Sequence, residues 1–125
     1  MKVAIVGSRS VGAIHYPTLC EQVPRGASMI ISGGAEGADR LARRYAAESG
    51  LSYVEIRPDY AVHGRSAPLR RNQEIVHRAD YVLVLWDGRS RGSAYVIKYC
   101  LDTGTPVRVL ICHPDGTGAK LLPRP

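Results

Sequence analysis

Three glycine-rich segments carry most of the residues in this 125-residue chain that could do chemistry. They are residues 7–10 (Gly-Ser-Arg-Ser), 32–39 (Ser-Gly-Gly-Ala-Glu-Gly-Ala-Asp) and 87–93 (Asp-Gly-Arg-Ser-Arg-Gly-Ser). Glycines let main-chain N–H groups approach a bulky anion closely, and the start of a following helix adds a positive potential. The segments therefore favour phosphate binding, although tight turns between strands and helices use glycines in the same way. Neither G-x-G-x-x-G with a downstream acid nor a Walker A motif is present, which excludes the usual dinucleotide and nucleoside triphosphate assignments.

The candidate ligand-binding residues lie in these segments or near the start of a later helix. They are Gly7, Ser8, Arg9, Ser32, Gly33, Gly34, Gly37, Asp39, Arg71, Asn72, Asp87, Gly88, Ser90, Gly92 and Ser93. Arg9 is the first choice for a phosphate ligand, because a guanidinium matches phosphate two bonds at a time; its alternative is a rim residue paired with a surface acid. Arg71 and Asn72 would close over a ligand from the far side. Asp39 would either contact the ligand or interact favourably with the dipole of the helix near whose start it lies. Trp86 could stack on a ring of the ligand, but packing in the core is the preferred interpretation.

Five short runs of β-branched and apolar residues alternate with segments of helical spacing. The runs at 3–6, 29–31, 53–56, 81–85 and 107–111 predict strands, and helices are expected at 14–23, from 38 to the stop at Gly50, at 67–79 and at 93–102. Strands this apolar fit a parallel sheet that is buried on both faces. The expected fold is α/β, a three-layer sandwich with a five-stranded parallel sheet in the order 3-2-1-4-5. In that order the three glycine-rich segments follow strands one, two and four and meet where the winding reverses.

Length and composition set limits on the class of protein. The chain suits one domain, expected over residues 1–113 with an irregular tail at 114–125, and 45% hydrophobic residues exclude a disordered chain. The net charge of +6 rests on fourteen Arg and only three Lys, which suggests anionic partners. Three widely spaced Cys indicate reduced thiols, and with no signal-like or membrane-spanning run they predict a cytoplasmic protein. Four scattered His predict no metal, and no cofactor is expected.

A family resemblance rests on four motifs in order along the chain. They are Gly7-Ser8-Arg9, Ser32-Gly33-Gly34-Ala35-x-Gly37-Ala38-Asp39, Arg71-Asn72, and Trp86-Asp87-Gly88-x-Ser90-x-Gly92-Ser93. Together they resemble the SLOG superfamily of Rossmann-like domains, in particular its small YspA-like, cpYpsA-related members. More distant members are lonely-guy phosphoribohydrolases, molybdenum-cofactor carriers and DNA-processing protein A. The resemblance implies a nucleotide-like or phosphate-bearing ligand over the carboxyl ends of the strands, and a homo-oligomer, either a dimer or a tetramer.

One departure from the lonely-guy enzymes concerns their catalytic acid. Those enzymes carry a glutamate in the loop after the fourth strand, which works with an arginine to cleave an N-glycosidic bond. In this chain the arginine corresponds to Arg71, but Val96 stands where the glutamate would fall. A carboxylate stabilises the oxocarbenium-like centre of ribosyl transfer. Asp87 or Glu36 could replace the missing glutamate, although nothing in their spacing requires it.

Three hypotheses follow, in descending order. The first is a binding domain for a nucleotide or a nucleotide-derived phosphorylated ligand. The second is a nucleoside 5′-monophosphate phosphoribohydrolase or related N-glycosidase, with Arg71 and either Asp87 or Glu36 as catalytic residues. The third is a DNA-binding protein like DNA-processing protein A, ranked last because Phe is absent and no basic run is interleaved with aromatic residues. No membrane partner is expected.

Overall fold

The computed structural model describes residues 1–113, 115 and 118–123. It contains one sheet in the order β3-β2-β1-β4-β5-β6, and the first five strands pair in parallel. The strands are β1 (Lys2–Gly7), β2 (Met29–Ser32), β3 (Ser52–Glu55), β4 (Tyr81–Trp86), β5 (Val107–Cys112) and β6 (Ala119–Leu121). The helices are α1 (Tyr16–Gln22), α2 (Ala38–Ser49), α3 (Tyr60–His63), α4 (Ala67–Arg78) and α5 (Arg91–Thr103), with 3-10 turns η1 (Ala13–His15) and η2 (Gly64–Ser66). The predicted α/β class and the order 3-2-1-4-5 are confirmed.

The strand count was one too low, because β6 lies in the segment expected to be an irregular tail. β6 runs antiparallel to β5, with Cys112 opposite Ala119 and Leu110 opposite Leu121. It pairs with the backbone groups along the outer edge of β5, and Leu121 packs against the core. Three residues are too few for a periodic signal, so only the partner edge identifies this strand. The tail prediction for residues 114, 116–117 and 124–125 lies outside the described residues.

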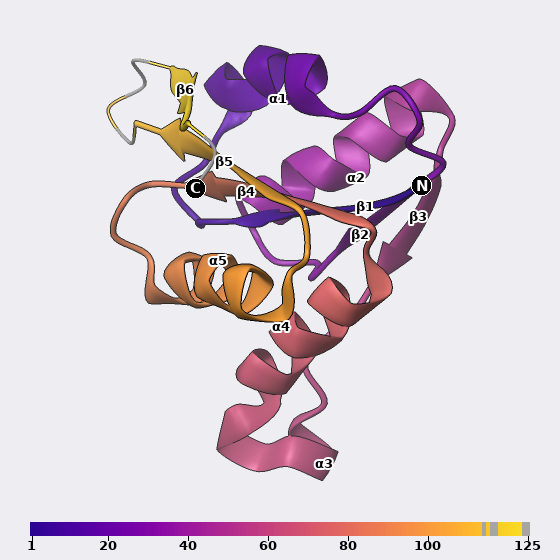
Figure 1. Ribbon diagram of the computed structural model, residues 1–125, viewed down its shortest axis with the longest axis vertical. Helices are drawn as coiled ribbons and strands as arrows, with labels where there is room; N and C mark the ends of the chain where they lie inside the picture. The colour runs from indigo at the N-terminus through magenta and orange to yellow at the C-terminus, as the bar shows by residue number, and fades with distance from the viewer. Residues whose placement is uncertain (114, 116–117, 124–125) are drawn as a thin grey trace.

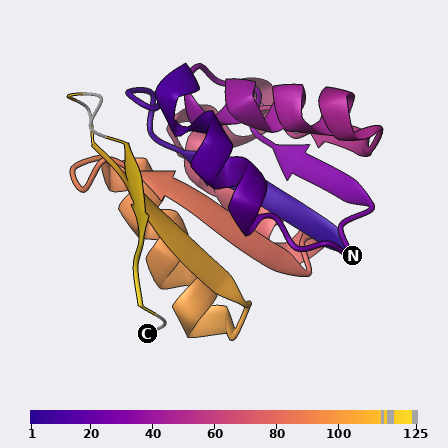
Figure 2. The ribbon, with the colours of Figure 1, turned by 90° about the horizontal axis from the view of Figure 1, so that it is seen from above.

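Alternate residues of each central strand enter two separate cores. In β1, Val3 and Ile5 face the side that α1 and α2 cover, whereas Ala4 and Val6 face α4 and α5. Figures 1 and 2 show this three-layer arrangement, with the sheet between the two helical layers. All four of these side chains are buried, which explains the uninterrupted apolar run in the sequence.

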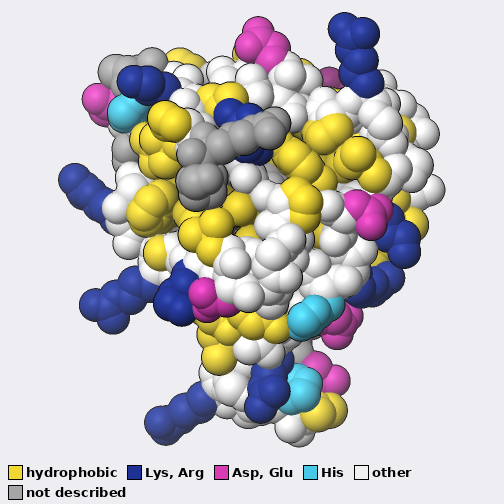
Figure 3. Space-filling model, in the orientation of Figure 1, with side chains coloured by type: hydrophobic (Ala, Val, Ile, Leu, Met, Phe, Trp, Pro, Cys, Tyr) yellow, Lys and Arg dark blue, Asp and Glu magenta, His cyan; other side chains and the backbone are white. Residues whose placement is uncertain are grey.

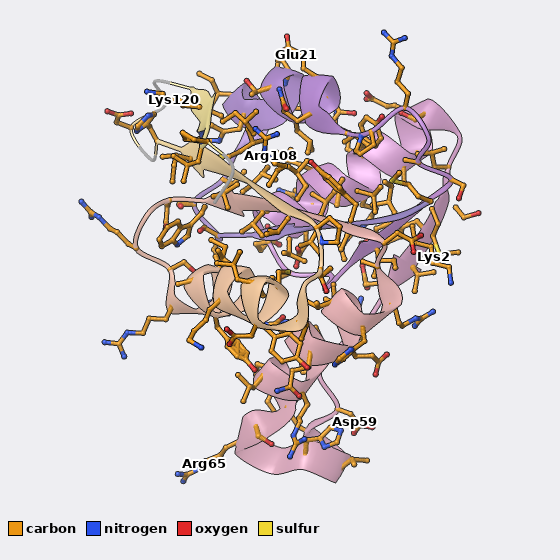
Figure 4. The ribbon with its side chains drawn as sticks, in the orientation of Figure 1. Lys2, Glu21, Asp59, Arg65, Arg108 and Lys120 are labelled. Atoms are coloured by element: carbon orange, nitrogen blue, oxygen red, sulfur yellow. The ribbon has the colours of Figure 1, made fainter. Side chains whose placement is uncertain are left out.

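An arm of residues 57–66 joins β3 to α4 and projects away from the sheet (Figure 1). It contains α3 and η2, whereas no helix was expected between the predicted strand at 53–56 and the predicted helix at 67–79. Asp59 caps α3, since its Oδ1 accepts a hydrogen bond of 3.2 Å from the Val62 amide. Figure 4 shows Asp59 and Arg65 in this arm, well away from the sheet. The arm delivers the chain to the start of α4, beside the carboxyl ends of the strands.

Gly7 ends β1 at a point where no side chain fits. A Cβ atom there would collide with the Leu85 carbonyl of β4 and lie 2.9 Å from the Cβ of Ala38. The next residue, Ser8, donates its amide to the same Leu85 oxygen at 2.9 Å. The close approach of β1 to β4 and to the start of α2 therefore depends on this glycine.

We expect Gly7→Ala to destabilise the protein by roughly 1–3 kcal/mol or more, because the colliding atoms belong to the backbone and cannot rotate away. The matched control is Gly12→Ala, since a Cβ at Gly12 has no neighbour within 4 Å. Urea unfolding of both variants and the wild type measures the difference. Equal stability of the two variants would contradict the account of this junction.

Candidate functional site

A cleft of about 490 Å³ lies over the carboxyl ends of the central strands. Its walls come from the segments that follow β1, β2 and β4 and from the first turns of α4 and α5. Most of the residues singled out from the sequence line it. These are Gly7, Arg9, Gly33, Asp39, Arg71, Asn72, Asp87, Ser90, Gly92 and Ser93. The three glycine-rich segments therefore converge on one site.

Ser8, also predicted to bind the ligand, is instead buried and joins two of the loops. Its side chain accepts a hydrogen bond of 3.1 Å from the Asp87 amide and lies 3.5 Å from Ser93 Oγ. Its carbonyl accepts from the Ala38 amide at the start of α2. Ser8 thus connects the segment after β1 with the segment after β4 and with the start of α2. It lies beneath the cleft and is not one of the residues that line the cleft.

Ser32 and Gly34 belong to a polar network on the β3 side of the glycine-rich segment that follows β2. Ser32 Oγ lies 2.6 Å from the Tyr53 hydroxyl, which donates to Glu55 Oε1 at 3.0 Å. The pKa of the Glu55 carboxyl is lowered, chiefly by its hydrogen bond from Arg57. The positive charges of Arg57 and Arg43, which both form ion pairs with Glu55, lower it further. Gly34 has φ +77°, and a Cβ there would collide with the Glu55 side chain. The network holds the loop in place, and neither Ser32 nor Gly34 is among the cleft-lining residues.

Gly37 and Gly88 were also predicted to bind ligand, but they shape the turns. Gly37 has φ +77°, and a Cβ there would strike the backbone carbonyls of Ser8 and Arg9. This contact joins the segments after β1 and β2. Gly88 has φ +81° and an open surrounding, so its role is the left-handed turn after β4.

Asp39 is the most deeply buried acid of the cleft, with 5% of its surface exposed. Its Oδ2 accepts a hydrogen bond of 3.0 Å from the Ala35 amide, so the side chain reaches back from α2 into the loop. Oδ1 is buried and has no hydrogen-bond partner among the described residues. Burial raises the pKa of Asp39 to about 6, although the Ala35 amide, the Arg71 charge and the Gly33 amide oppose the rise.

The Arg71 side chain extends from α4 to the glycine-rich segment that follows β2. Its Nη1 donates to the carbonyls of Gly33 at 3.0 Å and Ile56 at 3.4 Å, and its Nε donates to Asn72 Oδ1 at 2.9 Å. Partial burial lowers the pKa of Arg71, and the nearby Asp39 carboxylate works against that effect. A Cβ on Gly33 would stand 2.5 Å from Arg71 Nη1 and 3.1 Å from Asp39 Oδ2. Glycine at position 33 therefore lets the guanidinium and the carboxylate approach the same point.

Asp87 organises the loop after β4. Its Oδ1 accepts from the amides of Arg89 and Ser90 at 2.8 Å each, and its Oδ2 accepts from Ser10 Oγ at 2.9 Å. Partial desolvation raises the pKa of Asp87, but the hydrogen bonds from Ser90, Arg89 and the serine hydroxyls outweigh it and leave the pKa below its ordinary value. Asp87 is therefore an ionised carboxylate whose two oxygens both accept hydrogen bonds.

The other predicted positions divide between the cleft and the surface. Glu36 does not line the cleft; its side chain is 76% exposed and lies 3.7 Å from Arg40. Val96, which stands where the lonely-guy glutamate would fall, lines the cleft and is 3% exposed. Trp86 packs against the core on the α4 and α5 side and donates its Nε1 to the Ser90 carbonyl at 3.0 Å, so it braces the loop.

The sequence reasoning missed several lining residues. They are Val6, Ser10, Ala35, Pro68, Ile75 and Val96. Ser10 stands in the first glycine-rich segment, and its polarity beside Arg9 was a usable signal. The apolar residues form part of the walls, and their helical or strand periodicity marks them only as core.

The state of Asp39 yields a prediction about stability. On folding, the pKa of the Asp39 carboxyl rises from 3.8 to about 6. The raised pKa lowers the free energy of unfolding above pH 6 by roughly 3 kcal/mol, and this destabilisation disappears as the pH falls toward 4. Asp39→Asn removes the titrating charge and can still accept from the Ala35 amide. We expect the stability of the variant relative to wild type to be greatest near pH 7.5 and to shrink toward pH 4, as measured by urea unfolding. A difference that does not change with pH would contradict the burial of an ionisable Asp39.

Comparison with known proteins links the chain to a family. A family model described as YspA, cpYpsA-related SLOG family matches residues 1–63. The Gene 61 protein of Mycobacterium phage D29 is 35% identical over 85 residues, which cover 63% of this chain and 68% of the phage protein. No solved structure matches. The matched residues of this chain include the glycine-rich segments that follow β1 and β2, and the match ends before Arg71.

Proposed function

This chain belongs to the YspA, cpYpsA-related SLOG family, and from that membership and the cleft we propose that it binds a nucleotide or a nucleotide-derived phosphorylated ligand. The single observation that carries the proposal is the convergence of three glycine-rich loops and two arginines on one cleft. Its volume of about 490 Å³ falls within the range of roughly 300–1,000 Å³ typical of small-molecule sites.

The phosphate would lie at the start of α5. Ser90 caps this helix, and Gly92 and Ser93 of its first turn line the cleft. The positive end of the helix dipole and the main-chain N–H groups favour an anion there. Arg9, exposed at the rim, would neutralise the phosphate from the β1 side. Arg71 uses Nε and Nη1 in protein contacts, and we assign its Nη2 to the ligand.

The acids that the sequence offered as catalytic residues fit a binding site better than a site of N-glycosidic hydrolysis. Glu36 lies outside the cleft, Val96 replaces the catalytic glutamate of the lonely-guy enzymes, and both oxygens of Asp87 already accept hydrogen bonds. An oxocarbenium-like centre needs a carboxylate free to face it. We therefore expect no release of adenine when AMP is incubated with the protein, assayed by chromatography.

A small ligand also fits the charge distribution better than DNA does. On the face shown in Figure 3, Lys and Arg side chains lie at several separate places around the outline. Among the described residues, several cations are paired with neighbouring acids on their own helix, for example Arg44 with Glu48 and Lys98 with Asp102. DNA binding would instead use a continuous basic surface along the phosphate backbone.

Calorimetry against nucleoside monophosphates, ADP-ribose and cyclic dinucleotides tests the proposal. We expect at least one of them to bind, and Arg9→Ala and Arg71→Lys each to weaken that binding roughly tenfold or more, because each removes a charge-assisted hydrogen bond. The control is Arg25→Ala, an exposed arginine between α1 and β2, at the opposite ends of the strands. The proposal is wrong if no compound of the panel binds, or if Arg25→Ala weakens binding as much as the cleft variants do.

A further inference from the structure

The Asp39 carboxylate has a buried oxygen that the protein does not use. Oδ2 holds the Ala35 amide at 3.0 Å, while Oδ1 is buried and lacks a hydrogen-bond partner within the described part of the chain. The residue as a whole is 5% exposed, and it lines the cleft. A buried acceptor without a donor is unfavourable and rare in native proteins.

Packing and loop geometry do not explain why this residue is an acid. The bond to the Ala35 amide needs one acceptor oxygen, which an asparagine also supplies without a buried charge. The second oxygen has no hydrogen-bond donor among the described residues, and the residue that carries it lines the cleft near the Arg71 charge. Costly ionisable groups of this kind concentrate at functional sites.

The charge of Asp39 decides which part of the ligand it can meet. A phosphate would be repelled by the carboxylate, so the phosphate belongs at the start of α5 and near Arg9. The end of the cleft between Asp39 and Arg71 then receives an uncharged polar part of the ligand. Asp39 Oδ2 and Arg71 Nη1 both border the position that a Cβ of Gly33 would take, so a ligand group lying against Gly33 would be near both side chains.

A hydroxyl group suits this pair better than an amine does. A hydroxyl donates one hydrogen bond and accepts others, so it can donate to Asp39 and accept from Arg71. An exocyclic amine offers only donors and would meet the Arg71 donors unfavourably. In dinucleotide-binding folds an acidic residue likewise accepts from a ribose hydroxyl.

We infer that Asp39 selects ribose: its carboxylate accepts a hydrogen bond from a sugar hydroxyl of the bound nucleotide. This assignment rests on the proposed function. It makes Asp39 a specificity-determining residue that discriminates ribonucleotides from their deoxy analogues.

The assignment also predicts a pH dependence of the discrimination. The groups that face Asp39 are the Arg71 guanidinium from α4, the Glu55 carboxylate from β3 and the amides of Gly33 and Ala35. Below pH 6 the protonated carboxyl no longer accepts as an anion, so the preference for ribose should fall. AMP and its deoxy analogues carry the same phosphate, whose own titration therefore cancels in the ratio of their affinities.

The test compares AMP with 2′-deoxy-AMP, 3′-deoxy-AMP and purine riboside monophosphate, which lacks the exocyclic amine, by calorimetry at pH 7.5. We expect wild type to bind AMP roughly tenfold or more tightly than at least one deoxy analogue, as expected for a hydrogen bond to a charged group. Asp39→Asn should reduce this ratio to within threefold while binding the deoxy analogue about as well as wild type. Glu21→Gln is the control, because Figure 4 shows Glu21 on α1 pointing away from the sheet.

The outcomes separate this inference from the proposed function. If AMP and both deoxy analogues bind wild type equally, or if Asp39→Asn keeps the discrimination, the assignment of Asp39 is wrong and nucleotide binding still stands. Discrimination by the amine and not by a hydroxyl also overturns it. If none of these four compounds binds, the assignment of Asp39 is wrong, and the proposed function falls as well only if ADP-ribose and the cyclic dinucleotides also fail to bind. Should Asp39→Asn not fold, the wild-type ratio measured at pH 5 and pH 7.5 decides: a ratio that stays unchanged contradicts the role of Asp39.

Discussion

The cleft depends on the reversal of winding at β1. This strand pairs with β2 on one side and with β4 on the other, so the segments that leave the three strands meet over its end. The reversal requires a close approach of backbones, which Gly7 permits by having no Cβ against the Leu85 carbonyl. Ser8 then ties the segments together through bonds to the Asp87 amide and the Ala38 amide. The functional loops are therefore held by main-chain contacts beneath them, and their outer surfaces remain available to a ligand.

The two ends of the cleft differ in their electrostatics. Near α5, the helix start and Arg9 favour an anion, and Asp87 is engaged in shaping the loop. Near α4, Arg71 Nη1 and Asp39 Oδ2 both border the backbone of Gly33. The burial that raises the pKa of Asp39 to about 6 makes this acid unfavourable for folding at neutral pH. A residue that lowers stability and faces a cleft is typical of a functional site.

The fold was largely predictable because local pattern and chain topology agree. Uninterrupted apolar runs marked the strands of a sheet covered on both faces, and the handedness of crossovers fixed their order. β6 escaped prediction because a three-residue strand exists only through the edge of β5 beside it. The site was less predictable, because spacing cannot tell which loop residues turn outward. Ser8 and Arg9 are neighbours, yet one is buried as a connector and the other is exposed at the cleft. The unpartnered oxygen of Asp39 depends on packing between α2, the loop and α4, which no local pattern encodes.

The central claim, that the cleft is a nucleotide site, is tested most directly by amide chemical shifts recorded during a titration with AMP. The account predicts that the shifted amides cluster at the cleft, among them Gly33, Ala35, Gly92 and Ser93, while those of α1 and of the arm stay unchanged. Shifts confined to a different surface, such as the groove of about 340 Å³ beside Leu101 and Arg108, would contradict it. So would a spectrum that stays unchanged with AMP, with ADP-ribose and with the cyclic dinucleotides.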